Sequence, residues 1–417
     1  MKKILVLGVG AQGSTTVQRL DEEPLVQEVI CADYDEKAVS DIVKITKKTK
    51  GVKVDGSNFD DIVRVAQGVD LIVNALPLHF GKQVLEAAIE VGANYQDFSS
   101  PTNIFKTDKN EDETADNSWV RGIKLMYGDY SKQFEKIGKL ALTATGSAPG
   151  LIHVAARRAV RELDSCDTIY MFVYEGTEVT RFQPFWWAPD VALEDMHDPG
   201  YAYENGKLIR TPAFGLPVKR CFPELGDIEV EFTEHAHDEP VHMGLNADKF
   251  FKGAKNIYFK YGGVGANFAK PLHRAGLLSY EETIVNGCPV VPFDLVLAHL
   301  PPPPKTREEI KEIIDEGIIA DEGCFVVEVQ GKKDGRDTTV RVHVSSPGLA
   351  ESFERAGLTS EMYFTGQSGF IFTKMFIEGK FAQRGLISTD MLTEEQIDYY
   401  LDCAAKFDIT HTIHHLF

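Results

Sequence analysis

The chain has 417 residues, of which 43% are hydrophobic and 26% charged, and its formal net charge is −19. This length and composition predict a globular protein of two or three domains and exclude collagen-like and largely disordered proteins. Because nucleic acids and anionic membranes attract clustered cations, the acidic balance argues against both as partners. The six cysteines are scattered and the N-terminal apolar run is too short for a signal peptide. We therefore expect a cytoplasmic protein without a membrane span.

A short apolar run near the N-terminus leads directly into a glycine-rich sequence. Residues 4–7 (Ile-Leu-Val-Leu) are typical of a central parallel strand, and Gly8, Gly10 and Gly13 form the pattern G-x-G-x-x-G before a helical segment. A second apolar stretch ends in Asp33, about 20 residues further on. This order of strand, glycine turn, helix, strand and acid indicates a dinucleotide-binding domain.

Each position of this unit has a physical role in dinucleotide binding. Gly8 permits a tight turn, Gly10 lets the backbone approach the pyrophosphate, and Gly13 lets the helix pack closely on the strand. Asp33 would accept hydrogen bonds from the adenosine ribose and, with the acids that follow Tyr34, would repel a 2′-phosphate. We therefore expect NAD as cofactor, with NADP possible. The alternative is a glycine turn that binds no nucleotide.

The alternation of strands and helices continues along the first part of the chain. The predicted elements are strands at 52–54, 70–75, 94–98 and 140–144 and helices at 59–66 and 81–91. The ends of the strands at 70–75 and 94–98 would meet at the carboxyl edge of the sheet, where open α/β sheets bind ligands. The predicted cofactor contacts are Gly8, Gly10, Ala11, Gln12, Gly13, Asp33, Tyr34, Asn74, Ala75, Leu76, Pro77 and Ser99.

Strands dominate the chain after a helix predicted at 151–163. They are expected at 169–174, 227–232, 254–260 and 324–330, and the last of them forms a hairpin with 338–344 through Asp334-Gly335. An amphipathic helix is expected at 306–316, and the acidic segment 107–117 is expected to be an exposed loop.

The order of several motifs resembles the saccharopine dehydrogenase-like family, whose members include lysine 6-dehydrogenase, saccharopine reductase and carboxynorspermidine dehydrogenase. The matching motifs are Gly8 to Gly13, Val73 to Pro77, Ala93 to Asp97, Gly146 to Leu151, Lys255 to Lys260, Gly276 to Leu278, Gly379 to Phe381 and Gly385 to Ile387. The resemblance implies an α/β protein with an N-terminal Rossmann domain, a doubly wound parallel sheet over 1–130. C-terminal helices at about 346–417 would return to it. Residues 131–345 would form an α+β substrate and dimerisation domain with a mixed sheet, and the protein would be a homodimer.

The resemblance also implies a reaction class. We expect an NAD(P)-dependent oxidoreductase that acts on the CH–NH bond of a small amino acid or amine through an imine, as lysine 6-dehydrogenase does. Imine reduction to a secondary amine, as by saccharopine reductase or carboxynorspermidine dehydrogenase, is the alternative. A non-catalytic NAD-binding sensor also stays open. An S-adenosylmethionine methyltransferase would also have a glycine loop and an acid after the second strand. The second domain and the end of the strand at 70–75, Asn74 to Pro77, argue against this alternative.

Amine oxidation requires a neutral amine and a base whose pKa lies near about 7. His153, about one turn into the helix that follows Pro149-Gly150, is the first catalytic candidate, with a core histidine as the alternative. Asp97, at a strand end, is the second, with capping of the next turn as the alternative. The helix start after Pro149 and Gly150 could bind a substrate carboxylate, or it could be a domain-crossing turn. His79 is a third, weaker candidate.

Two other segments carry residue types of functional interest. Arg181 could bind a substrate carboxylate in a bidentate manner, and Trp186 could exclude water from the substrate, although domain packing explains the aromatic residues equally well. His235-x-His237, with His242 and the acids 238–239, has the residue types of a metal site, and its alternation suits a strand. The family resemblance implies no metal, so none is expected. The histidines near the C-terminus, His411, His414 and His415, are expected to be surface or packing groups.

Overall fold

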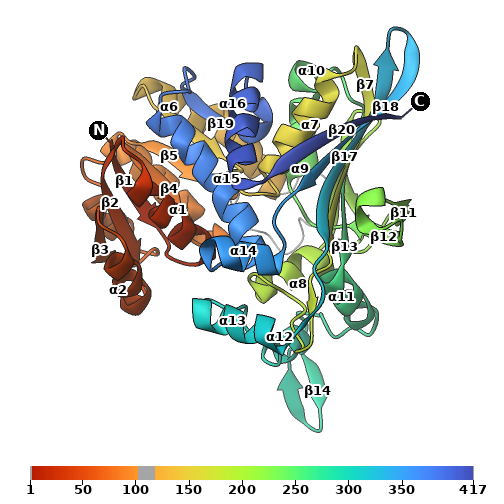
Figure 1. Ribbon diagram of the computed structural model, residues 1–417, viewed down its shortest axis with the longest axis horizontal. Helices are drawn as coiled ribbons and strands as arrows, with labels where there is room; N and C mark the ends of the chain where they lie inside the picture. Colours follow the sequence, from red (N-terminus) through yellow and green to blue (C-terminus); the bar gives the residue numbers. More distant parts are fainter. Residues whose placement is uncertain (1, 102–117, 417) are drawn as a thin grey trace. The chain divides into compact units, whose positions relative to one another are not determined.

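The computed structural model describes residues 2–101 and 118–416 (Figure 1). The chain divides into two compact units, one of Met1–Arg157 with Phe364–Asp408 and the other of Arg158–Tyr363 with Ile409–Phe417. The loop expected at 107–117 lies outside the described residues. Among residues 2–101 and 118–416, none of the helices combines the length and the apolar composition of a membrane span.

The first unit is built on a seven-stranded parallel sheet in the order β19-β6-β5-β4-β1-β2-β3. Its strands are β1 (Lys2–Leu7), β2 (Val26–Asp33), β3 (Thr49–Lys53), β4 (Leu71–Asn74), β5 (Asn94–Asp97), β6 (Leu140–Thr143) and β19 (Gly385–Ser388). The apolar run of β1 is fully buried from Ile4 to Leu7, as expected for a strand covered on both faces. The prediction of a Rossmann-like parallel sheet is confirmed.

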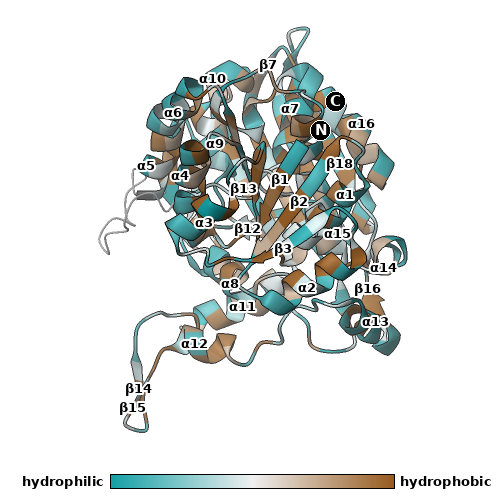
Figure 2. Cartoon of the chain, turned by 90° about the vertical axis from the view of Figure 1, so that its left-hand side faces the viewer, coloured by the Kyte–Doolittle hydropathy of each residue, from teal (hydrophilic) through white to brown (hydrophobic). Residues whose placement is uncertain are grey.

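Helices and short helical turns connect these strands. They are α1 (Ala11–Glu22), α2 (Glu36–Ile45), α3 (Phe59–Val65), η1 (Leu78–Phe80), α4 (Gly81–Val91), α5 (Ser118–Leu125), the π-helical η2 (Met126–Tyr130), α6 (Ser131–Lys136), α7 (Leu151–Arg161), α15 (Ser360–Ile377), η4 (Thr389–Met391), α16 (Glu394–Ala404) and η5 (Ala405–Phe407). One apolar core joins β1 and β2 to Val17 and Leu20 of α1, Ile42 of α2, and Phe370 and Ile377 of α15. Figure 2 shows hydrophobic, brown stretches along these two strands.

The C-terminal part of the chain differs from the expectation. β19 pairs with β6, so residues after 364 add a strand to the parallel sheet and not only helices. The last strand, β20 (Thr410–Leu416), instead pairs with β18 of the second unit. The observed boundaries therefore lie after residues 157 and 363, not after 130 and 345. The first boundary lies later than expected because β6 is hydrogen-bonded into the first sheet. The second is consistent with Phe370 and Ile377 of α15 packing in the core of the first unit.

The second unit contains a nine-stranded mixed sheet whose main path is β10-β9-β13-β7-β17-β18-β20. Its other strands are β7 (Ser165–Glu175), β9 (Gly200–Glu204), β10 (Lys207–Thr211), β11 (Val218–Cys221), β12 (Glu229–Glu234), β13 (Asn256–Gly263), β17 (Gly323–Lys333) and β18 (Arg336–Ser345). β7 and β13 are parallel, whereas β17 pairs with both of its neighbours in antiparallel fashion. The predicted hairpin is confirmed, since Asp334 and Gly335 both have positive φ angles, as a type I′ turn requires.

Helices and two small strand pairs complete this unit. They are β8 (Glu178–Val179) with β16 (Ile318–Ala320), β14 (Thr283–Val285) with β15 (Cys288–Val290), α8 (Pro189–His197), η3 (Pro223–Leu225), α9 (Glu239–Leu245), α10 (Ala247–Phe250), α11 (Val264–Arg274), α12 (Pro292–Leu297), α13 (Arg307–Glu316) and α14 (Leu349–Ala356). The predicted helix α13 begins with a capping box between Thr306 and Glu309. Figure 1 shows the β14–β15 hairpin projecting beyond α12.

Candidate functional site

The glycine loop between β1 and α1 has the backbone geometry that its sequence predicts. Gly8 has a φ of +90°, and a Cβ atom there would lie 2.6 Å from the carbonyl oxygen of Ala75. A Cβ atom on Gly13 would lie 1.9 Å from the carbonyl oxygen of Gly8. Both positions therefore exclude any larger residue, and the tight turn and the close packing of α1 depend on them.

The space in front of this loop fits a dinucleotide pyrophosphate. Gly10 is exposed, and a Cβ atom there would meet nothing within 4 Å. No side chain caps the N-terminus of α1 at Gly10. The side-chain oxygen of Gln12 is buried and has no hydrogen-bond partner among the described residues. Open space, an uncapped helix N-terminus and an unsatisfied polar atom in its first turn are what a bound phosphate group would use.

Asp33 lies at the carboxyl end of β2 and is bound to the glycine loop. Its Oδ2 accepts a hydrogen bond from the backbone N–H of Val9 at 2.7 Å, and its Oδ1 accepts one from the backbone N–H of Asp35 at 2.9 Å. Tyr34 is 70% exposed, and the Lys53 ammonium group lies 5.2 Å from the centre of its ring. The structure thus places Asp33 and Tyr34 beside the loop, at the edge where β1 and β2 end.

The ends of β4 and β5 form one buried hydrogen-bond network. Oδ2 of Asp97 accepts hydrogen bonds from the Asn74 amide at 2.9 Å and from the Tyr95 hydroxyl, and Oδ1 accepts from the backbone N–H and the hydroxyl of Ser99 at 2.9 and 3.1 Å. Oδ1 of Asn74 accepts from the backbone N–H of Leu76 at 3.3 Å. This network fixes the turns that follow both strands, Asn74 to Pro77 and Asp97 to Ser99.

Asp97 has the environment of a structural acceptor. It is 1% exposed, and burial raises the pKa of its carboxyl group, while hydrogen bonds from Tyr95, Asn74 and Ser99 oppose that shift. All four hydrogen bonds point from donors to its two oxygens, so little acceptor capacity is left for a substrate. The geometry favours the alternative in which Asp97 caps the turn after β5.

The turn between β6 and α7 is tied to the end of β5. The backbone N–H groups of Ala144 and Gly146 donate to the carbonyl oxygens of Ser99 and Phe98. Gly150 has a φ of +139°, and a Cβ atom there would lie 1.9 Å from the carbonyl oxygen of Gly146. This turn therefore lies at the same sheet edge as Asp97.

The first turn of α7 is not open to a substrate carboxylate. The backbone N–H groups of Leu151, Ile152 and His153 donate to the carbonyl oxygens of Gly146, Ser147 and Gly150. An N-terminal helix turn binds an anion through N–H groups that have no other acceptor. The structure therefore favours the reading of Pro149-Gly150 as a structural turn over the reading as a carboxylate site.

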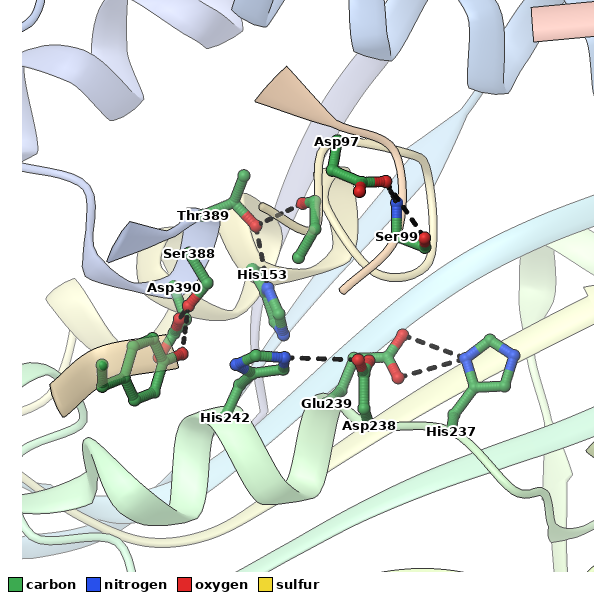
Figure 3. A network of polar contacts seen from close by, with 12 residues as sticks. Asp97, Ser99, His153, His237, Asp238, Glu239, His242, Ser388, Thr389 and Asp390 are labelled. Atoms are coloured by element: carbon green, nitrogen blue, oxygen red, sulfur yellow. Dashed lines mark hydrogen bonds and ion pairs between the residues drawn. The ribbon is translucent and has the colours of Figure 1, made fainter. Parts of the chain in front are cut away.

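His153 is fully buried in α7 and is oriented by Thr389 of η4 (Figure 3). Its Nδ1 lies 2.9 Å from the Thr389 hydroxyl, and that hydroxyl donates its hydrogen to the carbonyl oxygen of Ala144 at 2.8 Å. Because a hydroxyl has one hydrogen, Thr389 must accept from His153. Nδ1 therefore carries the proton, and in the neutral ring the lone pair lies on Nε2.

The segment that carries Thr389 is itself held firmly. The Arg157 guanidinium donates to the carbonyl oxygens of Asp390 and Leu392, each at 3.0 Å, and to the Glu394 carboxylate at 2.6 Å. The Ser388 hydroxyl donates to the Asp390 carboxylate. Sequence analysis did not identify Thr389 or Arg157. Gly385 to Ile387 belonged to a family motif, but nothing local in the sequence indicates that the residues after it contact α7.

In the second unit, Arg181 and Trp186 have partners within that unit. The Arg181 guanidinium forms a bidentate ion pair with Glu316, so a substrate carboxylate would have to displace Glu316. Trp186 is 7% exposed, and its indole N–H donates to the carbonyl oxygen of Thr177 at 3.2 Å. In the first unit, His79 is exposed in η1 beside Phe80.

The prediction that His235 and His237 lie on a strand is wrong. β12 ends at Glu234, and both residues lie in the loop that leads to α9. His242 lies in α9, where its Nε2 contacts Oδ2 of Asp238 at 3.2 Å (Figure 3). An alternation over three residues is too short to distinguish a strand from a loop. The exposed His414 and His415 lie on β20, and His411 is partly buried there.

Comparison with known families gives two matches that together span most of the chain. Residues 4–124 match the family described as the saccharopine dehydrogenase NADP binding domain. Residues 146–406 match the one described as the saccharopine dehydrogenase C-terminal domain.

Individual proteins agree with these matches. Carboxynorspermidine synthase from Vibrio alginolyticus is 26% identical over 83% of this chain and 79% of its own length. The enzyme of the same name from Vibrio cholerae is 24% identical over 86% of this chain and 82% of its own length. The solved structure of saccharopine dehydrogenase (L-Glu forming) from Saccharomyces cerevisiae covers 100% of both chains with a TM-score of 0.68 and 14% identity, a similarity of fold.

Proposed function

The chain belongs to the saccharopine dehydrogenase family and is an NAD(P)-dependent oxidoreductase of the CH–NH class, and we propose that it reduces an imine to a carboxylated secondary amine. The imine would form from an aldehyde and the primary amine of a diamine or amino acid. The observation that carries this choice of direction is the similarity to two carboxynorspermidine synthases over more than four fifths of the chain. Oxidation of the primary amine of a lysine-like substrate to an imine, the lysine 6-dehydrogenase type of reaction, is the second candidate.

The first unit supplies the cofactor site in this proposal. Gly10 leaves room for the pyrophosphate, Gly8 and Gly13 allow the tight turn and the close packing of α1, and the N-terminus of α1 would bind the pyrophosphate. Asp33 would accept hydrogen bonds from the ribose hydroxyls, which favours NAD over NADP because a 2′-phosphate would meet its charge. When bound, the nicotinamide supplies the hydride that converts the imine carbon into an amine carbon.

His153 would exchange a proton with the nitrogen of the reacting substrate. With Nδ1–H donated to Thr389, Nε2 is the nitrogen that can take up or release a proton. In the reductive direction a protonated Nε2 would keep the imine nitrogen positively charged, which makes its carbon a better hydride acceptor. In the oxidative direction the neutral ring would remove a proton from the ammonium group, because only a neutral amine releases hydride readily.

A paired spectrophotometric assay tests this function. Purified full-length protein is mixed with NADH or NADPH, a short aldehyde-bearing amino acid and one of several diamines, and cofactor oxidation is followed at the absorbance of the reduced nicotinamide. The oxidative arm offers NAD with lysine or with carboxylated polyamines. We expect cofactor oxidation that requires both the aldehyde and the diamine, with a secondary amine identified by mass spectrometry.

The arms separate the candidate functions. Turnover with lysine and NAD alone would favour the lysine 6-dehydrogenase type over the proposed direction. Cofactor binding in a fluorescence titration without turnover in either arm would indicate a non-catalytic NAD-binding protein and contradict the proposal. The variant His153→Gln, with unchanged cofactor affinity and lost turnover, would support the role of the ring. Size-exclusion chromatography with light scattering tests the accompanying proposal of a homodimer.

A further inference from the structure

Three potential metal ligands converge in the second unit, where sequence analysis expected none. Asp195 lies near the C-terminus of α8, and His235 and His237 lie in the loop between β12 and α9. One ligand atom from each residue lies within 4.8 Å of the other two. The backbone N–H of Ala236 donates to the carbonyl oxygen of Asp195 at 2.7 Å, which holds this loop against α8.

A second carboxylate orients the ring of His237. Its Nδ1 lies 3.2 and 3.1 Å from the two carboxylate oxygens of Glu239, as Figure 3 shows, and its Nε2 lies 3.7 Å from Oδ2 of Asp195. Histidines that bind metals through one nitrogen commonly donate the other N–H to a carboxylate, which fixes the ring and its tautomer. Glu239 is fully buried and is placed for this role.

His235 provides the observation that points most directly to a ligand. The side chain is 3% exposed and stacks on the ring of Tyr261, with ring centres 4.6 Å apart. Its Nε2 is buried and has no hydrogen-bond partner among the described residues. A buried polar atom without a partner is costly in a folded protein, and a bound ion or water molecule is one of the explanations for it.

We propose that Asp195, His235 and His237 bind one divalent transition-metal ion, of which zinc best suits two imidazole nitrogens and one carboxylate oxygen. At bond lengths of about 2.0–2.2 Å, tetrahedral ligand atoms lie roughly 3.4 Å apart. The distance of 3.7 Å between Nε2 of His237 and Oδ2 of Asp195 is close to that value. His235, the third ligand, has to move inward by a side-chain rotation. A water molecule or another oxygen ligand would take the fourth position.

The groups around the cluster are compatible with a cation. Besides Asp195, the carboxylate of Glu239 lies 3.1 Å from Nδ1 of His237. A metal ion bound by Nε2 of His237 would therefore have two carboxylates nearby. The competing reading is that His237 is the resident cation and no metal binds.

Metal content and cobalt spectroscopy of the intact protein distinguish these readings. The full-length protein is incubated with zinc chloride, and unbound zinc is removed by gel filtration. The zinc content per chain is then measured by mass spectrometry. A second sample receives cobalt chloride, whose visible absorption reports tetrahedral nitrogen and oxygen ligands. We expect one tightly bound ion per chain and intense cobalt bands. In His235→Ala and Asp195→Asn the ion should be lost, and Glu239→Gln should weaken binding about 10–100-fold.

The matched control is His299→Ala, which removes an exposed histidine from the same unit and should keep the full metal content. Circular dichroism verifies that each variant is folded, and Asp195→Asn, which conserves the size of the side chain, keeps the test valid if His235→Ala does not fold. A folded wild-type protein that retains no zinc and gives only the weak spectrum of aqueous cobalt would overturn the proposal. So would equal zinc content in the wild type and in both ligand variants. Neither result bears on the proposed oxidoreductase activity, which is measured separately.

Discussion

Asp33 accepts a hydrogen bond from the backbone N–H of Val9 at 2.7 Å, so the acid that would select the cofactor also holds the glycine loop. Replacing Asp33 by Asn removes its charge and weakens this contact. We expect affinity for both dinucleotides to fall and the ratio of NADP to NAD affinity to rise about tenfold or more, a difference of about 1.4 kcal/mol. Fluorescence titration with both dinucleotides measures the ratio. Asp35→Asn removes a neighbouring charge while Asn still caps α2, and it should change the ratio less than Asp33→Asn. An equal change in the ratio there would refute a specific role of Asp33.

Substitutions of two glycines in the same loop should have different effects, one on the stability of the fold and the other on cofactor binding. Gly13→Ala places a methyl group 1.9 Å from a backbone oxygen, so the free energy of unfolding should fall by roughly 3 kcal/mol or more. Gly10→Ala places a methyl group in open space, so the fold should tolerate it. The same methyl group would meet the pyrophosphate, and the dissociation constant for the cofactor should rise at least about tenfold.

Thermal unfolding and cofactor titration of both variants test this contrast. Gly128→Ala, which also meets nothing within 4 Å, controls for a general effect of adding a methyl group. Wild-type cofactor affinity in Gly10→Ala would show that the pyrophosphate does not approach this position.

Thr389 is a positioning residue for His153 in the proposed reaction. Thr389→Val keeps the shape but removes the acceptor for Nδ1–H, and we expect kcat to fall about tenfold or more with an altered pH profile. Thr389→Ser keeps the hydroxyl and should restore most of kcat. Steady-state kinetics from about pH 6 to pH 9 measure both effects. If Val and Ser reduce kcat equally and leave the pH profile unchanged, the hydroxyl does not act through His153.

A buried ion pair in the second unit makes a separate prediction about stability. Lys260 of β13 pairs with Glu234 of β12 and also donates to the carbonyl oxygen of Leu216 at 2.7 Å. Lys260→Met should cost about 3–5 kcal/mol, because it leaves a buried carboxylate without its partner. The double variant Lys260→Met with Glu234→Leu should recover most of that loss. Denaturant unfolding of the four proteins in a double-mutant cycle measures the coupling, and strict additivity would exclude it.

His411 on β20 should make stability depend on pH in the acidic range. Burial, with smaller effects from His343 and Arg158, lowers the pKa of His411 to about 4. An unfolded histidine titrates near about 6.5, so the unfolded chain takes up the proton first. The stabilising contribution is present above about pH 6.5 and is lost as the pH falls through about 4, by up to about 3 kcal/mol.

Unfolding midpoints between about pH 4 and pH 7 test this for the wild type and for His411→Leu, which should lose much of the pH dependence. His415→Leu, at an exposed position of the same strand, is the control. An unchanged pH dependence in His411→Leu would assign the effect to other groups.

Local patterns accounted for much of the fold. The apolar run of β1, the Asp334-Gly335 turn and the helix start at Thr306 all depend on neighbouring residues, so the sequence alone predicts them. β19 was not predicted, because its four residues become a strand only through pairing with β6. Strand propensity depends strongly on such a partner.

In the candidate site, too, some residues could be predicted from the sequence and others could not. The glycine loop and Asp33 lie within about 25 residues of each other and form a known physical unit. Thr389, in contrast, lies 236 residues after His153. Asp195 was likewise not associated with His235 and His237, because only the tertiary fold brings α8 to that loop. Such contacts leave no periodic or spaced signal in a single sequence.

The pairing of β19 with β6 has a consequence for how the chain folds. The parallel sheet cannot be completed until residues 385–388, which form its last strand, have left the ribosome. Until then the edge of β6 carries backbone donors and acceptors that another strand can pair with, the usual route to aggregation. A nucleotide-binding fragment truncated after residue 157 should therefore be prone to self-association, whereas the full chain protects that edge with its own late-synthesised segment.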